Sequence, residues 1–119
     1  MSNPVEEFNT YRSKMNKSLL AEASTTIKRI FNLDQNAYSK GSLDEGTKEL
    51  MGLVASTVLR CDECIKYHLE QCHRHNISKQ SVLEALEIAT VVGGSIVIPH
   101  LRKAYEYWGH IEMNTKKEK

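Results

Sequence analysis

The sequence predicts an all-α fold, and three observations support this prediction. Apolar residues recur three and four positions apart in several segments, which is the spacing of one face of an α-helix. Serine, proline and glycine stand at positions where helices begin and end. No segment shows the apolar–polar alternation or the turn dipeptides that are typical of paired strands.

The length of 119 residues is that of one domain, with N-terminal helices over residues 1–40 and a core over residues 43–110. A domain this small can leave apolar faces for a partner subunit. The net charge of +1 gives no reason to expect a nucleic acid or an acidic membrane as a partner. The N-terminus is polar and the longest apolar run, residues 88–99, is too short to cross a bilayer. We therefore expect a cytoplasmic protein whose three cysteines are reduced thiols.

Two helices are expected before the core. Pro4 suits a first helical position, where its missing N–H is no loss. The apolar residues that follow at helical spacing are Phe8, Tyr11, Met15 and Leu19. They predict a helix over about residues 4–21, with a break near Asn16 as an alternative. A second pattern covers residues 24–38, and Gly41 would end it because glycine tolerates the left-handed conformation.

The core is expected to begin with a capping box. Ser42 is followed three residues later by Glu45, a pairing that satisfies backbone N–H groups at a helix start. A helix should follow through Arg60. It carries Glu49 in its middle, where a charged side chain would be unremarkable if it faced water.

The helix after this one should begin near Cys61 and end around residues 75–76, where asparagine is a plausible stop. Ser78 would cap a further helix over about residues 79–92.

Residues 93–94, both glycine, indicate either a turn or a very close helix contact, and a last helix should follow over roughly residues 95–110. Pro99 lies inside that range, so it would either kink the helix or mark its true start.

The most informative stretch carries two cysteines three positions apart and a histidine four positions after the second. On a helix, Cys61, Cys64 and His68 would be neighbours on one face, with the Cβ atoms of the cysteines about 5–6 Å apart. That separation is wider than in a relaxed disulfide but within reach after a small adjustment. His68 would lie one turn beyond Cys64, where it can take or give a proton.

The thiolate is the reactive form of cysteine, and the neighbouring residues influence it in opposite directions. The helix N-terminus and Arg60 favour an anion at Cys61, whereas the two acidic residues between the cysteines disfavour it. Helix geometry favours Cys61 as the nucleophile, and the placement of the histidine favours Cys64. The residues alone leave open which cysteine attacks.

A thiolate that meets a hydroperoxide becomes a sulfenic acid, and a neighbouring thiol condenses with it to a disulfide. The cysteine pair supplies both sulfur atoms. The leaving alkoxide needs a proton, and Glu49 could orient or recharge His68 for that step. No organic cofactor is implied, but the oxidised pair would need a reducing partner.

The residues Glu49, Cys61, Cys64 and His68 together read E-x11-C-x2-C-x3-H. This pattern resembles the active-site signature of AhpD-like alkylhydroperoxidases in the carboxymuconolactone decarboxylase family. The glycine pair before the last helix also looks like that family, and the resemblance covers roughly residues 43–105. It implies an all-helical AhpD-like domain with peroxiredoxin-type activity, packed through its helices into a homo-oligomer, commonly a trimer or hexamer.

The resemblance also implies a role for each residue. Cys64 resembles the attacking cysteine and Cys61 the resolving one, while His68 and Glu49 resemble members of a proton relay. Glu63 departs from the best-known pattern, which has a relay histidine there, and a general thiol–disulfide exchange survives that loss more easily than peroxidase activity. The implied partners are a hydroperoxide or disulfide substrate and an unidentified dithiol reductant protein.

Other interpretations of the same residues stay open. The first is a lactone decarboxylase or another cofactor-free lyase of this family, although decarboxylating members generally lack the cysteine pair. The second is a non-catalytic oligomeric scaffold whose cysteines are inert or bind zinc. The residues of metal-ligand type that would share one helical stripe, meaning one face of this helix, are Cys61, Cys64, His68, Cys72 and His75. From first to last the helix rises about 21 Å at ~1.5 Å per residue, so one ion could reach only two or three neighbours.

The remaining polar and aromatic side chains have simpler expected roles. Cys72 is expected to be a packed thiol, and His73 and His75 to be exposed at a helix end. His100 and His110 show no ligand-like spacing and are interpreted as surface or satisfied polar residues. The aromatic residues Tyr105, Tyr107 and Trp108 are expected in the core and at a subunit interface.

Overall fold

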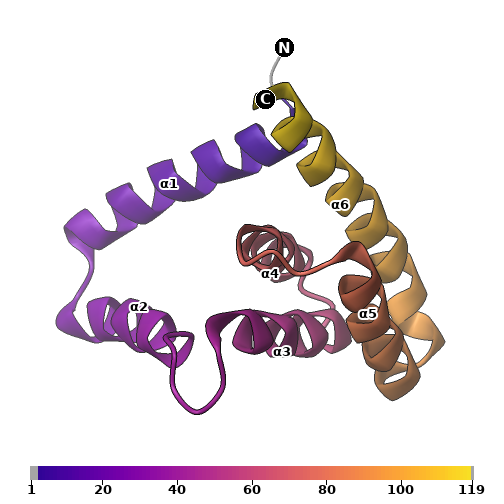
Figure 1. The fold of residues 1–119 in the computed structure, drawn as a ribbon. Helices are drawn as coiled ribbons and strands as arrows, with labels where there is room; N and C mark the ends of the chain where they lie inside the picture. The colour runs from indigo at the N-terminus through magenta and orange to yellow at the C-terminus, as the bar shows by residue number, and fades with distance from the viewer. Residues whose placement is uncertain (1–2, 119) are drawn as a thin grey trace. The chain divides into compact units, whose positions relative to one another are not determined.

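The protein is described by a computed structural model that covers residues 3–118 (Figure 1). Its elements are α1 (Pro4–Glu22), α2 (Thr25–Ala37), α3 (Glu45–Val58), α4 (Asp62–Arg74), α5 (Lys79–Gly93), the 3-10 turn η1 (Ser95–Val97) and α6 (Ile98–Glu118). No strand occurs within residues 3–118, and the predicted all-α class is confirmed. The chain divides into two compact units, and the boundary lies between Ser39 and Lys40. The single domain predicted over residues 1–119 stays a prediction.

The first unit holds α1 and α2, and both helices begin at a polar cap. Asn3 accepts a hydrogen bond from the backbone N–H of Glu6 at 2.9 Å, and Pro4 occupies the first helical position as predicted. α1 is continuous, so the alternative break near Asn16 does not occur. α2 ends with Tyr38 at its C-cap, so the prediction that Gly41 would end it is wrong, because the helix already closes three residues earlier.

The second unit is built from α3 to α6. α3 packs against both α4 and α5, and α4 packs against α6. These helices meet through fully buried apolar side chains, and burying one of them contributes about 1.5–3 kcal/mol. The largest are Leu53 of α3, Ile65 and Leu69 of α4, Val82 and Leu86 of α5, and Val97 of η1.

The start of α3 differs from the prediction. The N-cap is Asp44, whose Oδ1 accepts a hydrogen bond from the backbone N–H of Thr47 at 2.7 Å, and the capping box at Ser42 is therefore wrong. An ionised carboxylate suits the positive end of the helix dipole better than a hydroxyl. The same backbone hydrogen bond lowers the pKa of Asp44.

The junction between α5 and α6 explains how a proline is accommodated. Gly94 adopts a φ of 85°, a conformation that glycine tolerates, and η1 carries the chain into α6. α6 then begins at Ile98, so Pro99 lies in the first turn, where its missing N–H costs no hydrogen bond. Of the two predicted outcomes for Pro99, the true start nearby is the observed one, and the helix continues past residue 110 to Glu118.

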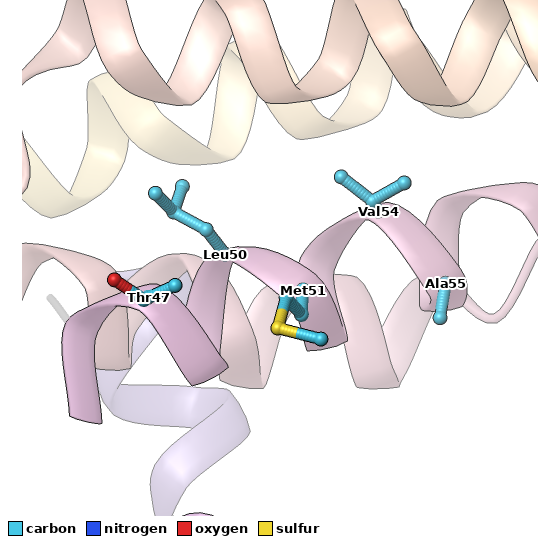
Figure 2. A pocket seen from close by; sticks show the side chains of 5 residues that line it. All are labelled: Thr47, Leu50, Met51, Val54 and Ala55. Atoms are coloured by element: carbon cyan, nitrogen blue, oxygen red, sulfur yellow. The ribbon is translucent and has the colours of Figure 1, made fainter. Parts of the chain in front are cut away.

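Apolar side chains also remain on the outside of the second unit. A hollow of about 410 Å³ lies along α3, and Figure 2 shows the side chains that line it. They are Thr47, Leu50, Met51, Val54 and Ala55. On α5, Ile88, Val91 and Val92 are more than half exposed. None of the helices within residues 3–118 is long and apolar enough to span a bilayer.

Candidate active site

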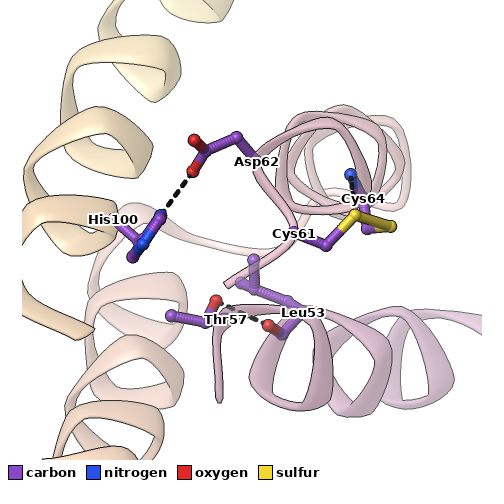
Figure 3. Close-up of a disulfide and its surroundings, with 6 residues drawn as sticks. All are labelled: Leu53, Thr57, Cys61, Asp62, Cys64 and His100. Atoms are coloured by element: carbon purple, nitrogen blue, oxygen red, sulfur yellow. Dashed lines mark hydrogen bonds and ion pairs between the residues drawn. A yellow bond between two sulfur atoms is a disulfide. The ribbon is translucent and has the colours of Figure 1, made fainter. Parts of the chain in front are cut away.

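The two cysteines of the predicted motif form a disulfide at the start of α4 (Figure 3). Cys61 is the N-cap of the helix and Cys64 lies in its first turn, with their Cα atoms 5.3 Å apart. Cys61 is extended, with φ −97° and ψ 95°, so the prediction that it belongs to the helical stripe is corrected. Its Sγ accepts a hydrogen bond from the backbone N–H of Cys64 at 3.3 Å.

The end of α3 determines where Cys61 sits. α3 closes at Val58 and does not run through Arg60 as predicted, because Arg60 takes a left-handed φ of 60°. The backbone N–H of Arg60 bonds to the carbonyl of Thr57, and that of Cys61 bonds to the carbonyl of Ser56, both at 3.0 Å. This pair of hydrogen bonds is the Schellman motif. One residue therefore ends the cap of α3 and begins α4, which fixes the first sulfur atom on a rigid junction.

A buried histidine–carboxylate pair lies one helical turn beyond the disulfide. His68 Nδ1 is 2.8 Å from Glu49 Oε1, and their side chains are only 9% and 5% exposed. Glu49 therefore does not face water, and its interpretation as a plain surface charge is wrong. Burial of either side chain alone would cost free energy, and the hydrogen bond between them offsets that cost. A hydrogen bond from Nδ1 to the carboxylate leaves Nε2 as the ring nitrogen that can exchange a proton.

Exposure changes steeply along this part of α4. Cys64 is exposed, Cys61 is half-buried, and His68 is buried four residues later. Residues four apart share one helix face, so Cys64 and His68 lie on the same side of α4. Cys64 is thus open to solvent, while the Glu49–His68 pair on the same side of α4 is sheltered.

The third cysteine, Cys72, is free and has no exposed area. Burial, with a smaller contribution from the Glu49 charge, raises the pKa of its thiol from 9.0 to about 12. The thiol is therefore neutral and unreactive at pH 7, as the packed-thiol interpretation expects.

One further interaction at this site could not be predicted from the sequence. Asp62, the first residue of α4, reaches two basic residues of α6: its Oδ1 is 2.7 Å from His100 Nδ1 and its Oδ2 is 3.2 Å from Lys103 Nζ. Burial would raise the pKa of Asp62, but the hydrogen bonds from His100 and Lys103 outweigh it, and the pKa is lowered. Two basic residues three apart on a helix were visible in the sequence, but nothing indicated a partner so distant along the chain.

The other candidate residues are placed as follows. Within residues 3–118, no three histidine, cysteine, aspartate or glutamate side chains gather closely enough to hold a metal ion. The ring of His73 contacts that of Trp108, with centroids 5.5 Å apart, so His73 is not simply exposed at the helix end. Tyr107 and Trp108 are buried, whereas Tyr105 is 56% exposed.

Comparison with known proteins adds the family. The sequence model of the carboxymuconolactone decarboxylase family matches residues 25–107, which include the disulfide, the Glu49–His68 pair and the first part of α6. The chain belongs to the carboxymuconolactone decarboxylase family. The resemblance to AhpD-like proteins is thereby confirmed, and the motif residues of this family member lie inside the matched range.

Three sequence relatives match over shorter stretches. An uncharacterized protein of Cupriavidus necator is 31% identical over 72 residues, which are 60% of this chain and 64% of that protein. An uncharacterized protein of Paracoccus denitrificans, encoded in a cox locus, is 26% identical over 72 residues, 60% of this chain and 65% of that protein. An alkyl hydroperoxide reductase AhpD of Corynebacterium kroppenstedtii is 34% identical over 62 residues, 52% of this chain and 36% of that protein. The matched stretch thus spans less than two thirds of each relative.

Solved structures match over nearly the whole chain. Two crystal structures of one Thermotoga maritima protein are each 50% identical, with TM-scores of 0.91 and 0.89, and they cover 93% and 95% of this chain and 97% of that one. One of them is described as a carboxymuconolactone decarboxylase family protein with a suggested part in an antioxidative response. A family member from Legionella pneumophila has a TM-score of 0.84 at 22% identity, covers 92% of this chain and 98% of that one, and shows the shared fold alone.

Proposed function

We propose that this protein is a thiol-dependent peroxidase of the AhpD type, which reduces an alkyl hydroperoxide through Cys64 and Cys61. The observation that carries the proposal is a Cys61–Cys64 disulfide at the start of α4, one turn before a buried Glu49–His68 pair. Two sulfur atoms that can exchange between thiol and disulfide, with a sheltered proton donor nearby, are what this chemistry requires.

In the first step the Cys64 thiolate attacks the outer oxygen of the hydroperoxide, and the O–O bond breaks. Cys64 becomes a sulfenic acid, and the leaving alkoxide takes a proton and departs as an alcohol. His68 supplies that proton from Nε2, having taken it from the Cys64 thiol when the thiolate formed. We assign the attack to Cys64 because it is the exposed member of the pair.

In the second step the Cys61 thiol condenses with the sulfenic acid, releasing water and forming the disulfide. The N-cap position favours the Cys61 thiolate, because the helix N-terminus and the backbone N–H of Cys64 both stabilise a negative sulfur. A dithiol reductant protein, not yet identified, then returns two electrons and two protons and is itself oxidised to a disulfide.

Glu49 orients His68 and stabilises the positive charge that His68 gains when it takes up a proton. Its hydrogen bond to Nδ1 selects the tautomer of His68 and stabilises the imidazolium when His68 holds two protons. This is the nucleophile–base–orienter arrangement in which the third group acts through the second. The sheltered position makes the ion pair stronger than it would be in water.

Glu63 favours a related activity, the exchange of thiols with a disulfide substrate. Glu63, exposed in the first turn of α4, occupies the position of the relay histidine in the best-known family pattern. A pair that lacks this histidine would still exchange with a disulfide substrate, because that reaction needs no proton for an alkoxide. Thiol–disulfide oxidoreduction is therefore the second candidate function.

We further propose that copies of this chain associate in the cytoplasm, without nucleic acid or membrane, as a trimer or hexamer. The support is the apolar surface of α3 and α5, which includes the hollow in Figure 2 and the exposed Ile88, Val91 and Val92. Light scattering of the purified protein tests this: a mass of one 13.6 kDa chain would contradict it.

Peroxide consumption in the presence of dithiothreitol tests the main proposal. We expect turnover with an alkyl hydroperoxide that disappears in the Cys64→Ser variant. Turnover of a small disulfide without turnover of peroxide would favour the second candidate. Any lactone decarboxylation that survives Cys64→Ser would instead favour the lyase alternative.

A further inference from the structure

The carboxylate of Asp62 lies inside the redox motif and is held from another helix, as Figure 3 shows for its contact with His100. One carboxylate oxygen is 2.7 Å from His100 Nδ1 and the other is 3.2 Å from Lys103 Nζ. His100 and Lys103 are neighbours on one face of α6, because residues three apart share a helix face. The side chains of His100 and Asp62 are 19% and 34% exposed, so this contact is partly sheltered from solvent.

These contacts give the first turn of α4 a second anchor. The first is the Schellman motif that joins Cys61 to the end of α3 through the backbone. The second joins Asp62, the next residue, to α6 through its side chain. Both anchors are made by atoms other than the two sulfur atoms.

The contacts also change the charge beside the sulfur atoms. A carboxylate next to a cysteine disfavours the thiolate, and Asp62 directly follows Cys61. The other charged residues nearby are Arg60 before the motif, Glu63 inside it and Lys66 after it. From α6, Lys103 faces Asp62 with a positive charge, and His100 contacts the same carboxylate through Nδ1.

We propose that His100 and Lys103 are positioning residues of the redox centre: by binding the Asp62 carboxylate they hold the first turn of α4 and offset a negative charge beside the thiols, so that the Cys61–Cys64 disulfide is a stronger oxidant. The electrostatic reason is that a group which stabilises the thiolate stabilises the reduced state. The inference rests on the proposed function only in requiring that Cys61 and Cys64 exchange between thiol and disulfide.

Equilibration with dithiothreitol measures this without any peroxide. In that reaction the protein disulfide accepts two electrons and two protons from reduced dithiothreitol, which closes to its own cyclic disulfide. We expect Asp62→Asn to make the protein more oxidising and the double variant His100→Ala/Lys103→Met to make it less oxidising. Each change should be about threefold to tenfold in the equilibrium constant, or about 15 to 30 mV for a two-electron couple.

The opposite signs separate an electrostatic role from a merely structural one. If the contacts only stabilised the fold, breaking them from either side would shift the equilibrium in the same direction. Arg102→Met is the matched control, since Arg102 is an exposed basic residue of the same helix turn. It should change the constant by less than about twofold, as expected for a solvent-screened charge. Replacing His100→Ala by His100→Asn in the double variant keeps a donor near the position of Nδ1 and should restore part of the loss.

The outcome is decided by the two signs. Opposite shifts, with circular dichroism showing folded variants, support the inference even if the wild-type protein consumes no hydroperoxide. Shifts of the same sign, or shifts no larger than that of Arg102→Met, overturn it even if peroxide turnover is established. Asp62→Asn keeps the side-chain shape, so it decides the matter if the double variant does not fold.

Discussion

Two thiol environments on α4 differ far more than their sequence distance suggests. At the start of the helix, Cys61 and Cys64 form a disulfide, and Cys64 is exposed. Two turns later Cys72 has the same side chain on the same helix, but it is fully buried and its thiol pKa rises to about 12. The difference teaches that the position of a cysteine relative to solvent and to the helix start decides its chemistry.

The buried Glu49–His68 pair lies between these environments and contributes to both. On one side it would hold a proton for the exposed pair. On the other, the Glu49 charge adds to the effect of burial in keeping Cys72 protonated. One carboxylate would thus promote chemistry at one thiol and suppress ionisation at another.

The largest expected effect comes from removing the sulfur atom of one cysteine in each environment. Cys64→Ser removes the nucleophile and should lower peroxide turnover by roughly 10⁴-fold or more, as deletion of a covalent nucleophile does. Cys72→Ala should leave turnover within about twofold, because a neutral buried thiol takes no part. Steady-state assays of both purified variants check this, and a large loss in Cys72→Ala would break the comparison.

Alkylation of the reduced, native protein should show the next largest difference. Raising a thiol pKa from 9.0 to about 12 lowers its thiolate fraction by roughly a thousandfold below pH 9. We expect iodoacetamide to modify Cys64 at least that much faster than Cys72, with mass mapping as the readout. Comparable rates in the folded protein would contradict the burial assigned to Cys72; equal rates after denaturation are the control.

A smaller effect is expected from the shared carboxylate. Glu49→Gln keeps a hydrogen-bond acceptor for His68 but removes the charge that stabilises an imidazolium, so turnover should fall by about 10²-fold. The same change should lower the pKa of Cys72, because the Glu49 charge contributes to raising it. Turnover unchanged in Glu49→Gln would remove Glu49 from the relay, whatever happens at Cys72.

The smallest expected effect concerns stability and its pH dependence. The pKa of Cys72 is higher in the folded protein than in the unfolded chain, so stability is highest below pH 9 and falls as pH rises from 9.0 towards about 12. In a Cys61→Ser/Cys64→Ser background, the additional Cys72→Ala change should cost about 1 kcal/mol at neutral pH and abolish this slope. Denaturant unfolding at several pH values measures both, and a slope that persists without Cys72 would assign it to another group.

The sequence predicted much of this structure because the signals are local. Pro4, Ser78 and the paired glycines lie at the helix ends where they were expected, and the spacing of apolar residues indicated the α-helices other than α4, which was predicted from the cysteine motif. Errors arose where two local signals competed: Asp44 capped α3 in place of Ser42, since both precede the same helix. Arg60 ends α3 early by adopting a left-handed conformation. The sequence did not predict this end because that conformation is rare for a residue with a side chain.

The site was predicted only in part, for a similar reason. The two cysteines and His68 stand within one short stretch, so spacing alone placed them together. Glu49 was added by resemblance to a family, because its burial depends on how α3 packs against α4. The contact of Asp62 with His100 joins residues 38 apart in the chain, and no periodicity reports such a pair.

The most direct test of the central claim is a thiol count on the reduced protein after one equivalent of an alkyl hydroperoxide, followed by peptide mass mapping. We predict rapid loss of two thiols, a Cys61–Cys64 linkage and an unmodified Cys72. Three thiols still free, or slow oxidation confined to Cys72, would contradict the account and leave the scaffold and lyase alternatives.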